Sequence, residues 1–231
     1  MPIDVFTGRA GSGKTSILSQ RLLEILARNK RYQKKTGVLR KVHLNFPIAQ
    51  KYETQYKEFL VYHDNETFVQ EMVKLEDCDI FIDELLYHFD ATMWKELGQG
   101  PKRFLAIHRH LGIEIYATSQ DFAQVDIAFR RLTDRLFYLV KLASSREPSA
   151  TRPPVKFIWG ISMIYTIPPT DYKEDQKENK TSFHWVFIHT RAKCEVYDTR
   201  QKYAPGAMPP LKHIDRTCED PNCTFHRVLH V

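Results

Sequence analysis

Hydrophobic and polar positions alternate along the chain in a pattern that predicts strands and helices in turn. A β-rich run, Ile3–Thr7, ends at Gly8, and from Lys14 the apolar residues recur with the spacing of one helical face. These apolar residues are Leu18, Leu22, Ile25 and Leu26. The Lys- and Arg-rich stretch Arg28–Lys41 is predicted to be a solvated loop. The chain therefore opens with a strand, a glycine loop and a helix.

The same alternation continues to residue 142. Further strands are predicted at apolar runs, which are Lys41–Phe46, Phe59–His63, Cys78–Asp83, Ile113–Thr118 and Arg135–Leu142. Helices are predicted at Glu66–Leu75, from Pro101 to a stop at Gly112, and from Asp121, which forms a capping-box pair with Gln124, to Leu132. Alternation of this kind is typical of βαβ units and predicts an α/β fold with a mainly parallel sheet.

The helical pattern ends after residue 142. Residues 143–154, rich in Ser, Pro and charge, are predicted to be a connection, and β segments are expected at Val155–Ile167, Phe183–His189 and Lys193–Tyr197. We therefore divide the chain into a core (1–142), the connection, a β extension of the same domain (155–200) and an irregular tail (201–231).

Composition narrows the class of protein. With 231 residues, of which 42% are hydrophobic and 27% charged, the chain can bury a sizeable core, which disfavours wholesale disorder and disulfide scaffolds. The net charge of +6 is compatible with nucleic acid, nucleotide or anionic lipid partners. Four cysteines without an apolar leader predict a reduced, cytosolic chain. The longest apolar run, Phe157–Ile167, is too short to cross a bilayer, so no transmembrane segment is expected.

The glycine loop carries the clearest chemistry. Residues Gly8-Arg9-Ala10-Gly11-Ser12-Gly13-Lys14-Thr15 fit the phosphate-loop pattern G-x-x-x-x-G-K-[ST], and together with Ser16 they are predicted to bind ATP. Glycines let successive amide N–H groups surround an oxyanion at the start of a helix, and Lys14 adds a cation for the β- and γ-phosphates. Thr15 would place its hydroxyl on Mg²⁺. The alternative is a glycine-rich turn with an ordinary surface lysine.

Polar residues at the ends of two strands supply candidates for hydrolysis. Asp83 and Glu84 follow a continuous apolar strand, so we expect Asp83 to hold Mg²⁺ and Glu84 to activate the attacking water. Gln120 follows the next strand and is a candidate sensor of the γ-phosphate. Acids that only mark a strand end, and a Gln120 that only belongs to a helix-capping cluster, are the structural alternatives.

Arginines on the predicted helices are candidates for a residue that acts on a neighbouring subunit. Arg109, Arg130 and Arg131 are candidates for such an arginine finger, and Arg130 or Arg109 is favoured. A solvated position or a surface ion pair is the alternative for each.

Taken together, these motifs resemble the zonular occludens toxin family. The matching residues are Gly8–Thr15, Asp83-Glu84, His108–Gly112, Thr118–Gln120, Val125-Asp126 with Arg130, and Val196–Thr199, so the resemblance spans about residues 1–200. That family includes the filamentous-phage morphogenesis ATPases and falls within the FtsK/HerA-like branch of phosphate-loop motors. The resemblance implies a RecA-like P-loop fold and an ATPase for phage assembly and extrusion.

The resemblance also implies partners and a place of action. It implies a homo-oligomeric ring, with a hexamer favoured, which works with phage coat or membrane-assembly proteins in the host cytosol or peripherally at the inner membrane. DNA is a further candidate partner. Typical phage members continue into a transmembrane helix and a periplasmic segment, and we expect neither here.

The tail carries a cysteine and histidine cluster. Cys218, Cys223, His226 and His230 have the residue types of a tetrahedral zinc site, although their spacing is not that of a standard finger, and an exposed polar tail is the alternative.

Three other functions compete with a phage-assembly ATPase. A soluble FtsK/HerA-like viral genome-packaging ATPase would use the same catalytic residues to translocate DNA, and DNA-stimulated turnover would identify it. A small-molecule kinase would need an acceptor pocket and an arginine-rich lid, and a non-enzymatic adaptor would hydrolyse nothing.

Overall fold

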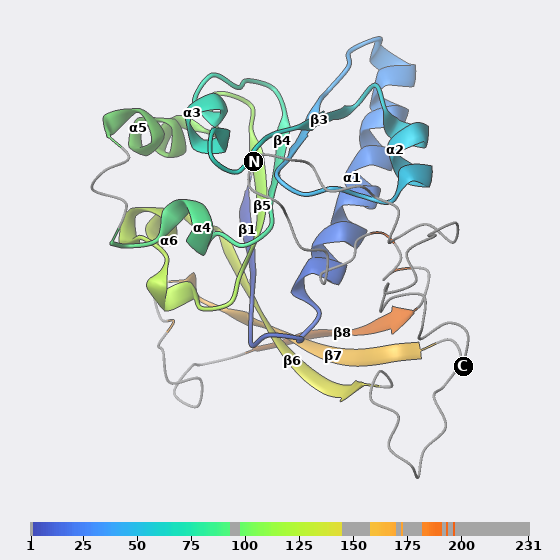
Figure 1. Ribbon diagram of the computed structural model, residues 1–231, viewed down its shortest axis with the longest axis vertical. Coiled ribbons are helices and arrows are strands. Elements are labelled where there is room, and N and C mark those ends of the chain that lie inside the picture. Colours follow the sequence, from blue (N-terminus) through green and yellow to red (C-terminus); the bar gives the residue numbers. More distant parts are fainter. Residues whose placement is uncertain are drawn as a thin grey trace.

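Within its described residues, the computed structural model contains one eight-stranded sheet (Figure 1). The described part of the chain is residues 2–92, 98–144, 158–169, 172, 182–190, 193 and 196. The strands are β1 (Ile3–Thr7), β2 (Val42–Leu44), β3 (Leu60–Tyr62), β4 (Asp79–Ile82), β5 (Glu114–Ser119), β6 (Arg135–Ser144), β7 (Ile158–Ile167) and β8 (Ser182–Thr190). Their order is β3-β2-β4-β5-β1-β6-β7-β8. Neighbours from β3 to β6 pair in parallel, and β7 and β8 extend the sheet with antiparallel pairs.

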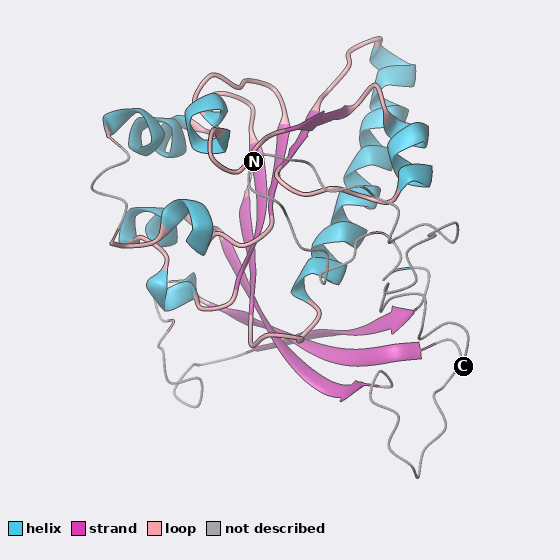
Figure 2. Ribbon diagram, viewed as in Figure 1, coloured by secondary structure: helices cyan, strands magenta, loops and turns pink. Residues whose placement is uncertain are grey.

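Helices cover both faces of the parallel strands. They are α1 (Lys14–Thr36), α2 (Gln50–Tyr56), α3 (Phe68–Met72), α4 (Leu86–Phe89), α5 (Gln99–Ile107) and α6 (Ile127–Leu132), with a 3₁₀ turn at Phe122–Gln124. The first two helices lie on one face, and α3 to α6 lie on the other (Figure 2). The sheet therefore separates two layers of helices, as the alternating sequence pattern predicts.

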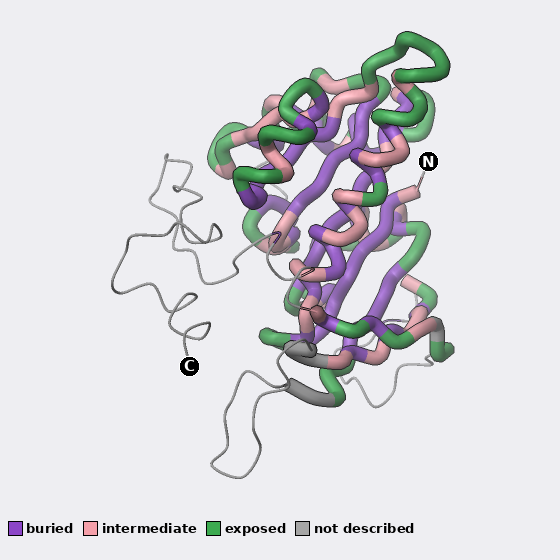
Figure 3. The backbone as a smooth tube through the Cα atoms, turned by 90° about the vertical axis from the view of Figure 1, so that its right-hand side faces the viewer, coloured by how far each residue is buried: buried purple, intermediate pink, exposed green. Residues whose placement is uncertain are grey.

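Each face of the sheet has its own apolar core. Val5 of β1 belongs to the apolar cluster that includes side chains of α3, α5 and α6, whereas its neighbour Phe6 belongs to the cluster that includes side chains of α1. The period of two along a strand sends successive side chains to opposite faces. Because both faces are covered, the central strands are buried almost throughout (Figure 3).

The predicted fold class is confirmed. The sheet is mainly parallel, is flanked by helices, and is extended by antiparallel strands from the C-terminal part of the chain. No helix in the described residues combines the length and the apolar character that crossing a membrane requires.

The prediction of a solvated loop at Arg28–Lys41 is wrong for most of that stretch. Helix α1 continues to Thr36 and stops at Gly37, which has a φ of 76°. The Gly37 N–H donates to the carbonyl oxygen of Gln33 at 2.8 Å. Unbranched Lys, Arg and Gln side chains lose little freedom in a helix, so a basic run does not end one.

Buried Asp79 gives the basic stretch a tertiary role. Its carboxylate, which is wholly buried at the start of β4, accepts hydrogen bonds from Arg28 at 3.1 Å, Arg40 at 2.8 Å and Asn29 at 2.8 Å. A buried carboxylate is stable only when its oxygens are paired in this way. Helix α1 is therefore tied to the sheet at Arg28 and Asn29, about two turns before its end.

Other boundaries also differ from the predictions. The segment from Asp121 splits into the 3₁₀ turn, whose cap Asp121 accepts from Ala123 N, and α6, which Asp126 caps through Ala128 N. Two capping acids five residues apart start two short helices instead of one. The helix predicted from Pro101 to Gly112 begins at Gln99 and ends at Ile107.

Some predicted segments lie wholly or partly outside the described residues. Within Lys193–Tyr197, only Lys193 and Val196 are described, and neither is in a strand. The tail (201–231), which includes the four proposed zinc ligands, lies outside the described residues.

Candidate nucleotide-binding site

The glycine loop joins β1 to α1 at the carboxyl edge of the parallel strands. The backbone is left-handed at Gly11 and Gly13, with φ of 73° and 94°, and the first helical residue is Lys14. The Lys14 ammonium donates to the carbonyls of Gly8 at 2.8 Å and Arg9 at 3.2 Å. Burial lowers the pKa of Lys14, and the nearby carboxylates of Glu84 and Asp83 oppose that shift. The cation thus lies against the loop.

Neighbouring strands press closely on this loop. A Cβ added at Gly8 would lie 2.6 Å from the carbonyl oxygen of Leu139 in β6, and a Cβ added at Gly13 would overlap the ring of His189 in β8. Only glycine fits these two positions without displacing a strand backbone or a ring. The glycine spacing of the motif is therefore required by packing as well as by backbone conformation.

Asp83 and Thr15 meet at the end of β4. The Thr15 Oγ1 donates to Asp83 Oδ1 at 3.1 Å, and Thr118 Oγ1, from β5, donates to the same oxygen at 2.7 Å. Burial raises the pKa of the Asp83 carboxyl, while the hydrogen bonds from Thr118 and Thr15 act in the opposite direction. The structure thus brings the predicted metal ligands Thr15 and Asp83 together from residues 68 positions apart.

Glu84 has a left-handed backbone, with φ of 63°. Its N–H donates to Thr118 Oγ1 at 2.9 Å, and its Oε1 accepts the Gln120 N–H at 3.3 Å. A non-glycine residue in this conformation costs on the order of 1–3 kcal/mol and is typical of functional sites. The Glu84 carboxylate therefore lies at the carboxyl ends of two adjacent strands, with the backbone of Gln120 beside it.

Asn45 is a site residue that the sequence reasoning missed. Its Oδ1 accepts the Asp83 N–H at 2.8 Å, and its Nδ2 donates to the Asp83 carbonyl at 3.0 Å. The side chain thus adds a further pair of hydrogen bonds between the ends of β2 and β4 and fixes the backbone of Asp83. The predicted strand 41–46 contains Asn45, so the end-of-strand signal used for Asp83 did not single it out, whereas β2 ends at Leu44 directly before it.

His88 supports Asn45 in its neutral form. The backbone of Asp83 fixes the orientation of the Asn45 amide, so Asn45 Nδ2, which also contacts Asn65 Oδ1 at 3.0 Å, faces His88 Nε2 at 3.2 Å. An amide nitrogen cannot accept a hydrogen bond, so His88 Nε2 can only be the acceptor in this contact. That acceptor role requires an unprotonated Nε2. Burial lowers the pKa of His88 to about 4, and burial also lowers the pKa of His43, on β2, to about 4.

Acidification is therefore expected to destabilise the fold. Between pH 6.5 and pH 4 the unfolded chain binds protons at His43 and His88 that the folded chain does not, so the free energy of unfolding falls as pH falls through that window. Each histidine contributes up to about 3 kcal/mol of loss. Urea unfolding at pH 7 and pH 4.5 measures this fall in the free energy of unfolding. The His88→Gln variant should lose less stability over this interval than the unmodified protein. Equal losses would contradict the assignment.

The loop and the strand ends fit a nucleotide phosphate with its magnesium ion. In the part of the chain described, the buried Ser12 hydroxyl has no hydrogen-bond partner, which leaves a donor or acceptor open within the loop. The Lys14 ammonium adds positive charge, and Thr15 and Asp83 offer the hard oxygen ligands that Mg²⁺ prefers.

The two predicted arginines lie elsewhere. Arg109 pairs with Asp134, which also accepts the Ile3 N–H, and so lies at the amino edge of the sheet. Arg130 lies in the last turn of α6, and its Nε is buried without a partner among the described residues. Within the described ranges, neither forms a hydrogen bond or ion pair with the phosphate loop of its own chain.

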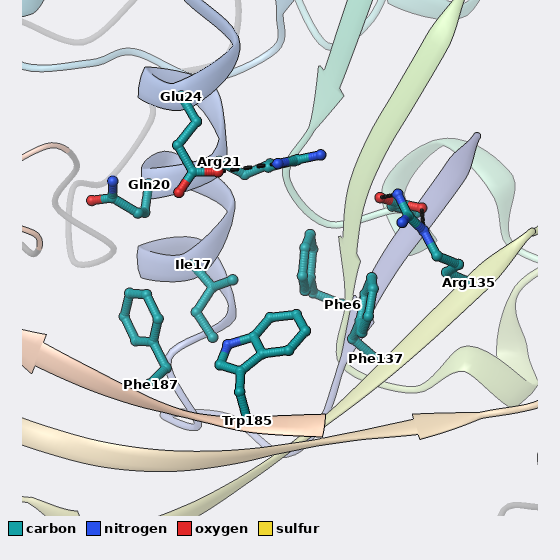
Figure 4. A pocket seen from close by; sticks show the side chains of 10 residues that line it. Phe6, Ile17, Gln20, Arg21, Glu24, Arg135, Phe137, Trp185 and Phe187 are labelled. Atoms are coloured by element: carbon teal, nitrogen blue, oxygen red, sulfur yellow. Dashed lines mark hydrogen bonds and ion pairs between the residues drawn. The ribbon is translucent and has the colours of Figure 1, made fainter. Parts of the chain in front are cut away.

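A cavity of about 260 Å³ lies on the face of the sheet that α1 covers, between α1 and β8 (Figure 4). Phe6, Phe137 and Trp185 form an aromatic wall, and Arg21 and Arg135 lie at its rim, paired with Glu24 and Asp4. None of the predicted site residues lines it. No cluster of three or more His, Cys, Asp or Glu side chains suited to a metal ion occurs within the described ranges.

Comparisons with known proteins identify a family and similar solved structures. The family model of the zonular occludens toxin (Zot) family matches residues 2–146. Among solved structures, the N-terminal domain of zonular occludens toxin from Neisseria meningitidis is 17% identical with a TM-score of 0.48, and the match covers 85% of this chain and 98% of that one. No curated protein matches the chain.

Two further solved structures are similar over most of their lengths. The genome packaging NTPase B204 from Sulfolobus turreted icosahedral virus 2, in complex with AMP, is 16% identical with a TM-score of 0.47, covering 80% of this chain and 96% of that one. A KaiC-like protein from Pyrococcus horikoshii is 11% identical with a TM-score of 0.44, covering 81% and 89%.

Proposed function

The chain belongs to the zonular occludens toxin family, and from that premise we propose that it is a magnesium-dependent ATPase motor for the assembly and extrusion of filamentous phage. The observation that carries the proposal is the contact between Thr15 and Asp83 beside Lys14, because it unites a phosphate-binding loop with a metal ligand from a separate strand. A glycine turn without function has no reason to bring these groups together.

The loop binds the triphosphate. Its amide N–H groups and the start of α1 face the phosphate oxygens, and Lys14 exchanges the carbonyls of Gly8 and Arg9 for the β- and γ-phosphates. Thr15 and Asp83 would hold the metal ion, and Asn45 keeps the backbone of Asp83 in place. When bound, Mg²⁺ neutralises negative charge on the β- and γ-phosphates.

Glu84 is the general base of the proposed hydrolysis. Its carboxylate accepts a proton from a water molecule while the water oxygen bonds to the γ-phosphorus. The bond from that phosphorus to the β–γ bridging oxygen breaks, which releases ADP and inorganic phosphate. Gln120, whose backbone N–H donates to Glu84 Oε1, senses the presence of the γ-phosphate.

A ring of identical subunits, with a hexamer favoured, provides the motion. Arg130, or in its place Arg109, reaches the γ-phosphate held by a neighbouring subunit and stabilises charge in the transition state. Work results from rotation of subunits between nucleotide states. We propose that the ring acts in the host cytosol or peripherally at the inner membrane, with phage coat or membrane-assembly proteins as partners.

Hydrolysis measurements on the full chain test the proposal. We expect ATP hydrolysis that requires Mg²⁺, and assembly into a ring in the presence of ATP when the protein is sized by light scattering. The assay is repeated with single- and double-stranded DNA, because the net charge of +6 is compatible with DNA as the translocated substrate. Strong stimulation by DNA would favour genome packaging over phage extrusion. Folded protein that takes up neither ATP nor ADP in calorimetry would refute both.

A further inference from the structure

The β7–β8 hairpin supports the phosphate loop through two consecutive buried hydrogen bonds. The Ser162 Oγ of β7 donates to the carbonyl oxygen of Ser12 at 2.7 Å, and the same Oγ lies 2.7 Å from His189 Nε2 of β8. Ser162 is 1% exposed and His189 is 7% exposed. Two residues from the C-terminal strands therefore contact a loop about 150 positions earlier in the chain.

The direction of both hydrogen bonds follows from the number of available protons. A serine hydroxyl has one hydrogen, and the carbonyl of Ser12 can only accept, so the hydrogen of Ser162 is directed to Ser12. Ser162 Oγ must then accept from His189, which places a proton on Nε2 of that ring. His189 thus fixes the rotation of the Ser162 hydroxyl, and the hydroxyl fixes the carbonyl of Ser12.

Fixing the Ser12 carbonyl also orients the next N–H. The described chain contains no cis peptide bonds, and in a trans peptide the C=O and the N–H point in opposite directions. Because the Ser12 carbonyl points to β7, the Gly13 N–H points away from the hairpin. The same N–H belongs to the set of loop amides that the proposed function directs at the phosphates.

The strand that carries His189 also packs against α1. Trp185 and Phe187 extend from β8 toward Ile17 in the first turns of α1, and all three line the cavity between the strand and the helix (Figure 4). On the same face of β8, the ring of His189 fills the space in which a side chain at Gly13 would lie. The strand therefore contacts both the loop and the helix that the loop begins.

We propose that Ser162 and His189 are positioning residues for nucleotide binding, which hold the Ser12–Gly13 peptide with its N–H turned toward the phosphates. The inference rests on the proposed ATP binding and adds a requirement to it: the antiparallel hairpin, and not only the phosphate-loop motif, sets the affinity for nucleotide. Neither residue touches the nucleotide itself.

Matched variants test this role by calorimetry with ATP, ADP and Mg²⁺, together with steady-state hydrolysis. Ser162→Ala leaves the Ser12 carbonyl without its donor and is expected to raise the Kd for both nucleotides about tenfold, equivalent to about 1.4 kcal/mol. Because the lost support acts alike on bound ATP and on the transition state, KM should rise while kcat changes less than about twofold. A purely structural defect would reduce the amount of active protein and would not produce this split.

The histidine is tested by a conservative rescue. His189→Leu removes the donor and should raise the Kd as Ser162→Ala does, whereas His189→Gln keeps an N–H and should bind within about threefold of the unmodified protein. Val186→Ala is the control, because Val186 lies on the opposite face of β8 and is 47% exposed. Its Kd should not change.

The outcomes separate the inference from the proposed function. If the unmodified protein binds no nucleotide, the proposed function fails. If it binds, but Ser162→Ala and His189→Leu bind equally well, the inference alone is overturned. A similar loss in Val186→Ala would also overturn it, because the hairpin would then act only through stability. If Ser162→Ala does not fold, as judged by circular dichroism, the two His189 variants decide.

Discussion

Replacing Lys14 by alanine is expected to weaken ATP binding by about a hundredfold or more while leaving the fold intact. The ammonium would interact with phosphate oxygens, and charged hydrogen bonds contribute roughly 1.5–3 kcal/mol each. The cost to the fold is small, since burial of the ammonium lowers the pKa of Lys14 and offsets its bonds to Gly8 and Arg9. Calorimetry with ATP and Mg²⁺ measures the affinity, and thermal unfolding without nucleotide measures the fold.

Lys34→Ala is the matched control. Lys34 is an exposed lysine in the last turn of the same helix, α1, so its removal changes the net charge equally and lies far from the loop along the helix. Its ATP affinity should equal that of the unmodified protein. Tight ATP binding by Lys14→Ala would leave the loop as a structural turn and remove the basis for the proposed ATPase.

Glu84→Gln is expected to separate binding from hydrolysis. Loss of a general base lowers turnover by roughly 10²–10⁴-fold. The amide has the same shape as the carboxylate, and its oxygen can still accept the Gln120 N–H, so the Kd for ATP should change less than about threefold. Single-turnover hydrolysis measures the chemical step, and calorimetry measures binding in the same variant.

Glu76→Gln provides the comparison for this variant. Glu76 is exposed and precedes β4, so the substitution removes the same carboxylate chemistry away from the strand's carboxyl end. Its turnover should remain at the level of the unmodified protein. Retained turnover in Glu84→Gln would exclude Glu84 as the base and would leave Asp83 as the acid to be tested next.

The parts of the site that follow from local sequence could be predicted. The phosphate loop is encoded in eight consecutive residues, since three glycines and a lysine largely dictate its conformation and charge. Asp83 and Glu84 are signalled by the apolar strand before them, because parallel strands present their carboxyl ends at one edge of the sheet. That the structure joins Thr15 to Asp83 follows from the strand order.

The parts that depend on distant pairing could not be predicted. In the sequence, Ser162 and His189 have no feature that distinguishes them from other strand residues. Their position beside the loop is set by the register of the antiparallel pairs from β6 to β8. The length of α1 was underestimated because the burial of Asp79, not the local pattern, gives Arg28 a partner. Helix α2 has a single buried residue, Tyr56, and so shows no apolar stripe.

The two anchors of α1 give this helix a mechanical role in the proposed motor. It is 23 residues long, which corresponds to roughly 34 Å at 1.5 Å per residue. The helix begins at Lys14 in the phosphate loop, and Arg28, 14 positions and roughly 21 Å further along, pairs with Asp79 at the amino edge of the sheet. A helix that starts at the loop and is tied to the sheet at Arg28 would carry a small tilt at the nucleotide end to the opposite side of the subunit.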